Sequence, residues 1–252
     1  MLVTHKFLEF DWGKGFESHN TILDVVPYEP ETIFIGSFNP DWDWNPADFY
    51  YGRGMYMWPI LANLFLNNRN TIENRRNDNT EPTLNQIFEI CKQGKITFAD
   101  IVKGTKNEIS LARTGNVYFV NNTYEWDSYK DKQLDYLGKE GYLDDNVDEI
   151  VKYINETPSI KRVYFTFKSG HWLVKKMKLI KDQINTPIKG SIFTPSGNGF
   201  RRLLVNFPSK PSSIAHCWVW NGLQHTFPIT RKGYCNLDHD WLRINGVDIN
   251  NF

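Results

Sequence analysis

The sequence predicts an α/β protein in which three αβα layers surround a central, mostly parallel four-stranded sheet. Short apolar runs rich in β-branched and aromatic residues are typical of buried strands, and they recur at 32–38, 95–102, 162–167 and 190–195. Patterns typical of amphipathic helices lie at 57–68, 83–94, 145–157 and 169–185. Strands that alternate with helices indicate a parallel sheet with both faces covered.

Two residues frame the helix expected over 83–94. Thr83 precedes the periodic segment and is predicted to be its N-cap, while Gly94 follows the last apolar residue and is predicted to be its C-cap. The polar segment 67–82 is typical of a long surface loop. We expect this loop to lie within one domain rather than between two.

The composition limits the classes of protein to consider. A chain of 252 residues buries enough apolar surface to fold without disulfides, and its three cysteines form no CxxC pair. We therefore expect no metal and no cofactor. The N-terminus has no signal-like apolar run and no stretch of eighteen apolar residues occurs. We expect a cytoplasmic protein with no membrane partner.

The charge of the chain is zero overall but unevenly distributed. Residues 1–160 hold 15 Lys and Arg against 25 Asp and Glu, whereas residues 161–252 hold 14 against 4. A basic C-terminal part can form an electropositive face that meets phosphates. The alternative is a set of solvated helix faces, and charge alone favours this alternative for the lysines of 175–181.

Polar segments follow each of the four predicted strands. They are 36–51, 103–107, 168–171 and 194–202. Because ligands bind at the carboxyl ends of strands in such sheets, we expect these segments to line one rim.

Two of the segments resemble motifs of the uracil-DNA glycosylase superfamily. IFIGSFNPDWDWNPADFYYGRGMYMWPIL (33–61) is similar to its leading motif, and IFTPSGNGFRR (192–202) is similar to its closing motif. The nearest branches are the mismatch-specific uracil and thymine glycosylases and the hypoxanthine-type enzymes. The resemblance covers about residues 30–205 and implies one domain over 1–252, with 206–252 as an extension packed on the core.

The resemblance implies a DNA glycosylase that hydrolyses the N-glycosidic bond of a deaminated or mismatched base, such as uracil, hypoxanthine or thymine. The base would be flipped out of the DNA, and water would attack directly. We expect a monomer whose partner is DNA.

Asn39 matches the Asn of the superfamily's Asn-Pro step, and the resemblance implies that its amide orients the attacking water. Asp41 is its rival, because a carboxylate can accept a proton and stabilise positive charge. Asp43 is expected in a solvated turn, and an Asx-turn before Pro40 is the alternative role for Asn39. Asp100, at the end of the second strand, could face the pocket, but we expect it to cap a helix or to be structural.

The remaining candidates would grip the base and the DNA. Tyr51 lies at the expected twelve-residue step from Asn39, while the alignment around Trp58 favours Tyr50 as the stacking ring. Phe38 and Thr194 are further candidates for base binding. The expected DNA-binding residues are Ser196, Gly197, Asn198, Phe200, Arg201 and Lys168.

Two departures from the family pattern leave other functions open. Met55-Tyr56-Met57-Trp58 stands where relatives carry Asn-Arg-Phe-Trp, and Thr194 stands where they carry Asn or His. One alternative is a weak or inactive relative that binds nucleic acid or a nucleotide. Another is an unrelated doubly wound protein with a phosphorylated ligand, although the chain has no GxGxxG or GxxxxGK loop.

Overall fold

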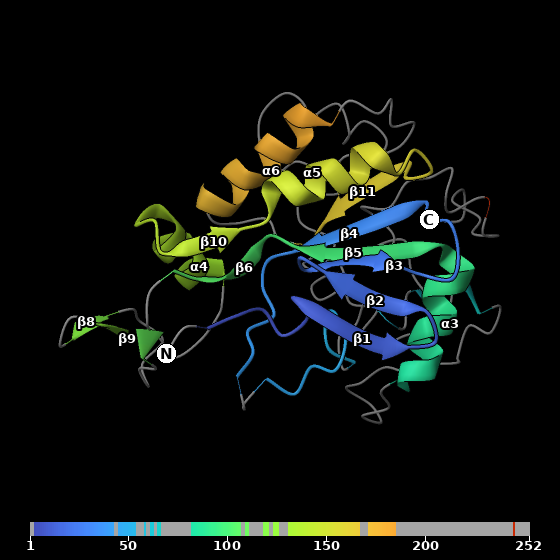
Figure 1. Ribbon diagram of the computed structural model, residues 1–252, viewed down its shortest axis with the longest axis horizontal. Coiled ribbons are helices and arrows are strands. Elements are labelled where there is room, and N and C mark those ends of the chain that lie inside the picture. Colours follow the sequence, from blue (N-terminus) through green and yellow to red (C-terminus); the bar gives the residue numbers. More distant parts are fainter. Residues whose placement is uncertain are drawn as a thin grey trace, which may run out of the picture.

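The computed structural model is built around one six-stranded sheet (Figure 1). It describes residues 3–42, 45–53, 58, 61–62, 65–66, 82–106, 109–110, 118–120, 123–125, 131–166, 171–184 and 244. The strands of the sheet are β1 (Glu9–Gly13), β2 (Phe16–His19), β3 (Ile22–Val25), β4 (Thr32–Gly36), β5 (Ile96–Asp100) and β11 (Arg162–Phe165). Their order is β1-β2-β3-β5-β4-β11.

The sheet is mixed, so the predicted central, mostly parallel four-stranded sheet of a three-layer αβα fold is wrong. β5, β4 and β11 are parallel, but β1, β2, β3 and β5 pair with one another in an antiparallel manner. Residues 9–25 form these extra strands through hairpins. Asn20 and Thr21 both have positive φ, which matches the twist of a two-residue hairpin and forces β2 and β3 to run in opposite directions.

Three of the four predicted strands correspond to β4, β5 and β11. The fourth, 190–195, lies outside the described residues. β1 was not predicted because most of its side chains are exposed and it has no continuous apolar run.

Four helices are described: α3 (Leu84–Gly94), α4 (Asp131–Lys139), α5 (Val147–Glu156) and α6 (His171–Gln183). Three of them lie where periodicity predicts them, and α4 was not predicted. Thr83 caps α3 as expected, and it exchanges hydrogen bonds with Gln86 in a capping box. The C-cap is Lys95 in the left-handed region, with φ 49°, rather than Gly94.

Smaller strands complete the described chain. β6 (Val102–Thr105) pairs with β10 (Leu143–Asp145). β7 (Ile109–Ser110), β8 (Tyr118–Val120) and β9 (Thr123–Glu125) form a separate three-stranded sheet. In the expected helix 57–68, Trp58, Leu61, Ala62 and Phe65 are helical, and most of the other residues lie outside the described ones.

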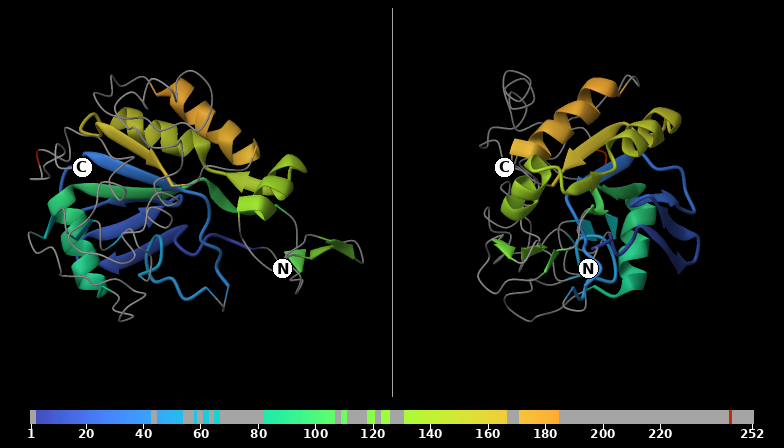
Figure 2. Two further views of the ribbon diagram at one scale, coloured as in Figure 1. Left: turned by 180° about the vertical axis from the view of Figure 1, so that it is seen from behind. Right: turned by 60° about the vertical axis from the view of Figure 1, so that its left-hand side comes forward.

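The helices α5 and α6 lie on one side of the sheet and α3 on the other (Figure 2), and each side holds an apolar cluster. Phe34, Phe98 and Tyr164 face α3 together with Trp58. The alternate residues Ile33, Ile35 and Val163 face α4, α5 and α6. Successive strand residues point to opposite faces, so each strand contributes to both clusters. Within the described part of the chain, no helix has the length and apolar character needed to cross a membrane.

Candidate active site

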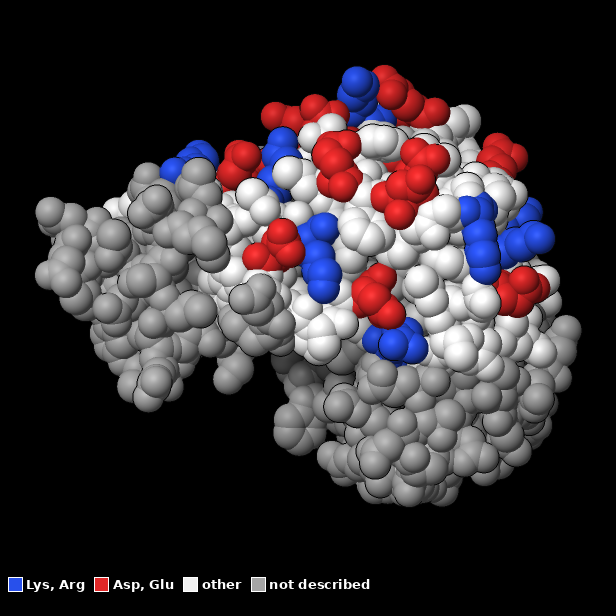
Figure 3. Space-filling view, turned by 60° about the horizontal axis from the view of Figure 1, so that its bottom comes forward, with Lys and Arg blue, Asp and Glu red and all other residues white. Residues whose placement is uncertain are grey.

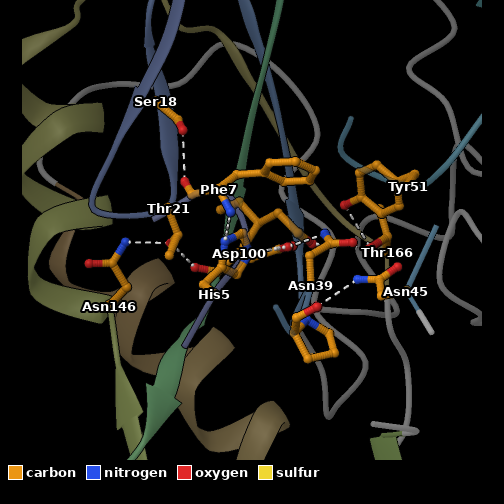
Figure 4. Close-up of polar contacts among 12 residues, drawn as sticks. His5, Phe7, Ser18, Thr21, Asn39, Asn45, Tyr51, Asp100, Asn146 and Thr166 are labelled. Atoms are coloured by element: carbon orange, nitrogen blue, oxygen red, sulfur yellow. Dashed lines mark hydrogen bonds and ion pairs between the residues drawn. The ribbon is translucent and has the colours of Figure 1, made fainter. Parts of the chain in front are cut away.

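The carboxyl ends of β4 and β5 bring a buried carboxylate next to a glycine. Gly36 pairs with Asp100 in the parallel register, and Asp100 is 1% exposed. Its Oδ2 accepts a hydrogen bond from Asn39 Nδ2 at 2.6 Å and lies 2.8 Å from His5 Nε2 (Figure 4). Three segments distant in sequence therefore meet at one carboxylate.

The hydrogen bonds of His5 define which ring nitrogen carries the proton. The backbone N–H of Phe7 donates to His5 Nδ1 at 2.9 Å, so Nδ1 is an acceptor. Nε2 then carries the proton and donates to Asp100 Oδ2. The backbone of His5 is itself held, because its N–H donates to Lys103 O and its segment bridges to Pro40.

Only one orientation of the Asn39 amide gives Asp100 a hydrogen-bond donor. An ionised carboxylate oxygen only accepts hydrogen bonds, so the amide nitrogen faces Asp100 and the amide oxygen faces away from it. Figure 4 shows the Asn39 amide between Asp100 and the side chains of Tyr51 and Thr166. Asn39 is partly exposed, and its amide oxygen remains an acceptor that Asp100 does not use.

Two oxygens, Asp100 Oδ1 and the Tyr51 hydroxyl, occupy the space above Gly36. A Cβ built on Gly36 would overlap Asp100 Oδ1 and would lie 2.9 Å from the Tyr51 hydroxyl. Only glycine leaves room for both groups at this point of the sheet. Asp100 Oδ1 is thus directed over the end of β4, on the opposite side of the carboxyl group from the two donors.

Tyr51 is the aromatic residue that borders this space. Its φ of 63° is unusual for a bulky side chain, and its hydroxyl lies 2.9 Å from Thr166 Oγ1. Thr166 Oγ1 in turn donates to Ile35 O at 3.3 Å, so the Tyr51 hydroxyl is the donor to Thr166. The Tyr51 ring is partly exposed.

Tyr50 belongs to the core instead. It is 0% exposed, and its ring stacks on Phe98 with centroids 5.7 Å apart and an interplanar angle of 14°. Burial, reinforced by the charge of Asp100, raises the pKa of Tyr50 well above its ordinary value. Its hydroxyl has no hydrogen-bond partner in the described structure.

A strained turn holds the backbone of Asp100. Thr21 has φ 62°, which is costly for a β-branched residue. Its carbonyl accepts from Asp100 N at 3.1 Å, and its hydroxyl donates to Asp100 O at 2.6 Å. Asn146, at the start of α5, donates to the same hydroxyl at 2.8 Å. The carboxylate is therefore fixed from the β2–β3 turn as well as from its own strand.

The other predicted site residues either lie apart from the contacts around Asp100 or fall outside the described residues. Asp41 is exposed, with its backbone N–H bonded to Thr4 O, and it is not among the donors and acceptors around Asp100. Phe38 is buried beside His5, with ring centroids 5.9 Å apart. The remaining candidates lie outside the described residues: Asp43, Lys168, Thr194, Ser196, Gly197, Asn198, Phe200 and Arg201.

Sequence reasoning did not consider His5, and it ranked a helix-capping or structural role for Asp100 above a position facing the pocket. Asp100 could have been ranked higher, because it ends a fully buried strand beside a glycine that ends another. His5 lies 95 residues from its partner and has no motif around it. Nothing in a single sequence indicates that contact.

The charges on the described surface are mixed. On the face shown in Figure 3, Lys and Arg lie among Asp and Glu rather than in one basic patch. In the described residues, no group of three His, Cys, Asp or Glu side chains is arranged to hold a metal ion. No protein-family model, curated protein or solved structure matches the chain.

Proposed function

We propose that this protein is a DNA glycosylase that hydrolyses the N-glycosidic bond of a deaminated or mismatched base. One observation carries the proposal: Asp100 accepts a hydrogen bond from the amide nitrogen of Asn39, so the amide oxygen of this partly exposed residue faces away from Asp100. An acceptor held in this way can align a water molecule for attack on a sugar carbon.

The chemistry of the bond suits such a group. Glycosidic bonds break through a transition state with oxocarbenium character, in which positive charge develops on the sugar. A nearby negative charge stabilises this state, and a weakly basic acceptor is enough to direct the water. Asp100 supplies the charge and Asn39 the direction, from adjacent positions.

The ring of Tyr51 supplies a surface for the base. A base must leave the DNA stack before its glycosidic bond can be reached, and a flipped base is commonly stacked on an aromatic side chain. Tyr51 is partly exposed and its hydroxyl is anchored to Thr166, so the ring is held beside Asp100 and Asn39.

Base release from oligonucleotides tests the proposal. Duplex and single strands with uracil, hypoxanthine or mismatched thymine are incubated with the protein, and abasic sites are revealed by alkaline cleavage. We expect cleavage of at least one substrate by the wild type, and a loss of about hundredfold in Asn39→Ala. Asn85→Ala is the matched control, because Asn85 is an exposed asparagine on α3.

Two outcomes would contradict the proposal. Cleavage that is unchanged in Asn39→Ala would remove the catalytic role of the amide. If no substrate is cleaved but DNA binding is strong and falls with salt, the protein would be a nucleic-acid-binding protein without this activity.

A further inference from the structure

We infer that Asp100 is the general base of this hydrolysis and that His5 is its positioning residue. The inference rests on the proposed glycosylase function and deepens it, because it assigns the proton-accepting atom. That atom is Asp100 Oδ1.

The two carboxylate oxygens of Asp100 have different surroundings. Oδ2 accepts from His5 Nε2 and Asn39 Nδ2, at 2.8 and 2.6 Å. Oδ1 accepts from neither of these donors and is directed over Gly36, next to the Tyr51 hydroxyl. Hydrogen bonds to Oδ2 therefore fix the carboxyl plane and leave Oδ1 as the oxygen that neither donor uses.

The hydrogen bond between Asn39 and Asp100 joins the residue that aligns the water to the residue that takes its proton. The amide oxygen of Asn39 and Oδ1 of Asp100 both belong to side chains that are joined by the 2.6 Å hydrogen bond. In the proposed step, a water that donates a hydrogen to Asp100 Oδ1 keeps a lone pair free for attack. This arrangement aligns the nucleophile and prepares its deprotonation in one step.

The step balances without another reactant. The water oxygen forms a bond to the anomeric carbon while the bond from that carbon to the base nitrogen breaks. The electrons of the breaking bond leave with the base, and the water proton moves to Asp100 Oδ1. The released base then takes up a proton, and Asp100 returns to its ionised form.

The structure favours Asp100 over Asp41 for this role. Asp41 is exposed and is not one of the residues bonded to Asn39 or His5. Asp100 is 1% exposed and its backbone is held at both its N–H and its carbonyl by Thr21. A general base requires a fixed position within reach of the water, and Asp100 has that position.

His5 acts through Asp100 rather than on the substrate. Its ring donates from Nε2 and accepts at Nδ1, so it joins Asp100 to the backbone of the N-terminal segment. Replacement by phenylalanine removes the donor and lets the carboxylate rotate. Replacement by glutamine keeps an N–H at a similar reach from the backbone and should preserve the orientation.

Single-turnover base release by Asp100→Asn tests the inference on whichever substrate the wild type cleaves. Asparagine keeps the size of the side chain and removes the proton acceptor. We expect the rate to fall by about hundredfold or more, with DNA affinity within about threefold of the wild type. Asp24→Asn is the matched control, since Asp24 forms another His–Asp contact in the described part of the chain, with His19 at 2.8 Å, on the surface.

The His5 variants test the positioning role separately. We expect His5→Phe to slow the chemical step by about tenfold with unchanged DNA affinity, and His5→Gln to recover most of that loss. A purely structural histidine would instead give equal losses of thermal stability and of activity in both variants.

Failure of the inference and failure of the proposed function are distinguishable. Base release by the wild type that continues at a similar rate in Asp100→Asn would overturn the inference and leave the glycosylase function intact. No base release by the wild type would overturn both. If Asp100→Asn does not fold, Asp100→Glu replaces it: a slow rate with normal affinity supports the inference, and an unchanged rate overturns it.

Discussion

Asn39 donates its amide hydrogen to Asp100 Oδ2 across 2.6 Å, and this hydrogen bond turns the amide oxygen away from the carboxylate. The two residues come from different elements, the loop after β4 and the end of β5, which are neighbours in the sheet. The parallel pairing of these strands thus builds the arrangement on which the proposed chemistry depends.

Asn39→Asp should make the stability of the protein depend on pH. Two carboxylates at this distance cannot both be ionised, so the pair takes up a proton with a pKa raised above that of an aspartate in the unfolded chain. A raised pKa in the folded state means that stability is lost as pH rises. We expect the variant to be less stable than the wild type by about 3 kcal/mol at pH 8 and to recover much of this at pH 5.

Urea denaturation of both proteins at the two pH values measures this difference. Asn85→Asp, on the surface of α3, is the control and should show little change. A deficit of Asn39→Asp that stays constant with pH would contradict the close contact between residues 39 and 100.

Gly36→Ala should displace the carboxylate of Asp100. The new methyl group would overlap Asp100 Oδ1 and approach the Tyr51 hydroxyl to 2.9 Å, so one of them must move. We expect a cost of about 1–3 kcal/mol in stability together with loss of base release.

A double-mutant cycle shows whether the overlap with Asp100 is the cause. In an Asp100→Ala background the obstructing oxygen is gone, and Gly36→Ala should cost less than it does in the wild type. Equal costs in both backgrounds would show that Asp100 Oδ1 does not lie over Gly36.

Tyr50→Phe and Tyr51→Phe should have opposite effects. The Tyr50 hydroxyl is buried and has no partner in the described structure, so its removal should leave stability unchanged or raise it by about 1 kcal/mol. The Tyr51 hydroxyl donates to Thr166, so its removal should lower stability by about 1 kcal/mol and loosen the ring beside Asp100. Thermal unfolding of both variants compares them, and the reverse order would contradict the assignment of Tyr50 to the core.

Asp24→Asn should weaken the protein only at acid and neutral pH. The hydrogen bond to Asp24 raises the pKa of His19 above its ordinary value, and the charges of Asp24, Glu9 and Glu17 add to this effect against desolvation. A raised histidine pKa gives stability that is fully present below the ordinary pKa of about 6.5 and is lost as pH rises through the folded value. The side chain of His19 is 45% exposed, so solvent screening keeps the effect below about 1 kcal/mol.

Denaturation of Asp24→Asn at pH 5.5 and pH 8.5 checks the sign. The wild type should be the more stable protein at pH 5.5, and the two should converge at pH 8.5. A larger difference at the alkaline pH would contradict the direction of the His19 shift.

The elements that sequence predicts well are those with a continuous apolar signal. β4 is buried along its whole length and appears as an apolar run, and α3 begins at the capping residue that its sequence indicates. β1 to β3 were missed because each has only four or five residues and none forms a continuous apolar run: β1 is mostly exposed, and β2 and β3 include partly buried positions. Short hairpins of this kind depend on turn conformation, which a pattern of hydrophobicity does not record.

The residues of the candidate site also differ in how well the sequence predicts them. The Asn39-Pro40 pair follows a strand and could be located from its motif. Asp100 and His5, in contrast, are joined by a contact between residues 95 positions apart. The choice between Tyr50 and Tyr51 required the backbone, because a left-handed φ at Tyr51 turns the two rings into different environments. Local propensity does not favour that conformation in a tyrosine.

The most direct test of the glycosylase proposal is hydrolysis in water enriched in ¹⁸O. Duplexes with a single uracil or hypoxanthine are incubated with the wild type and with Asn39→Ala, and the products are weighed by mass spectrometry. We predict free base together with an abasic strand that carries one ¹⁸O, formed by the wild type and about hundredfold more slowly by the variant. Intact strands with no free base above background for every base tested would contradict the account.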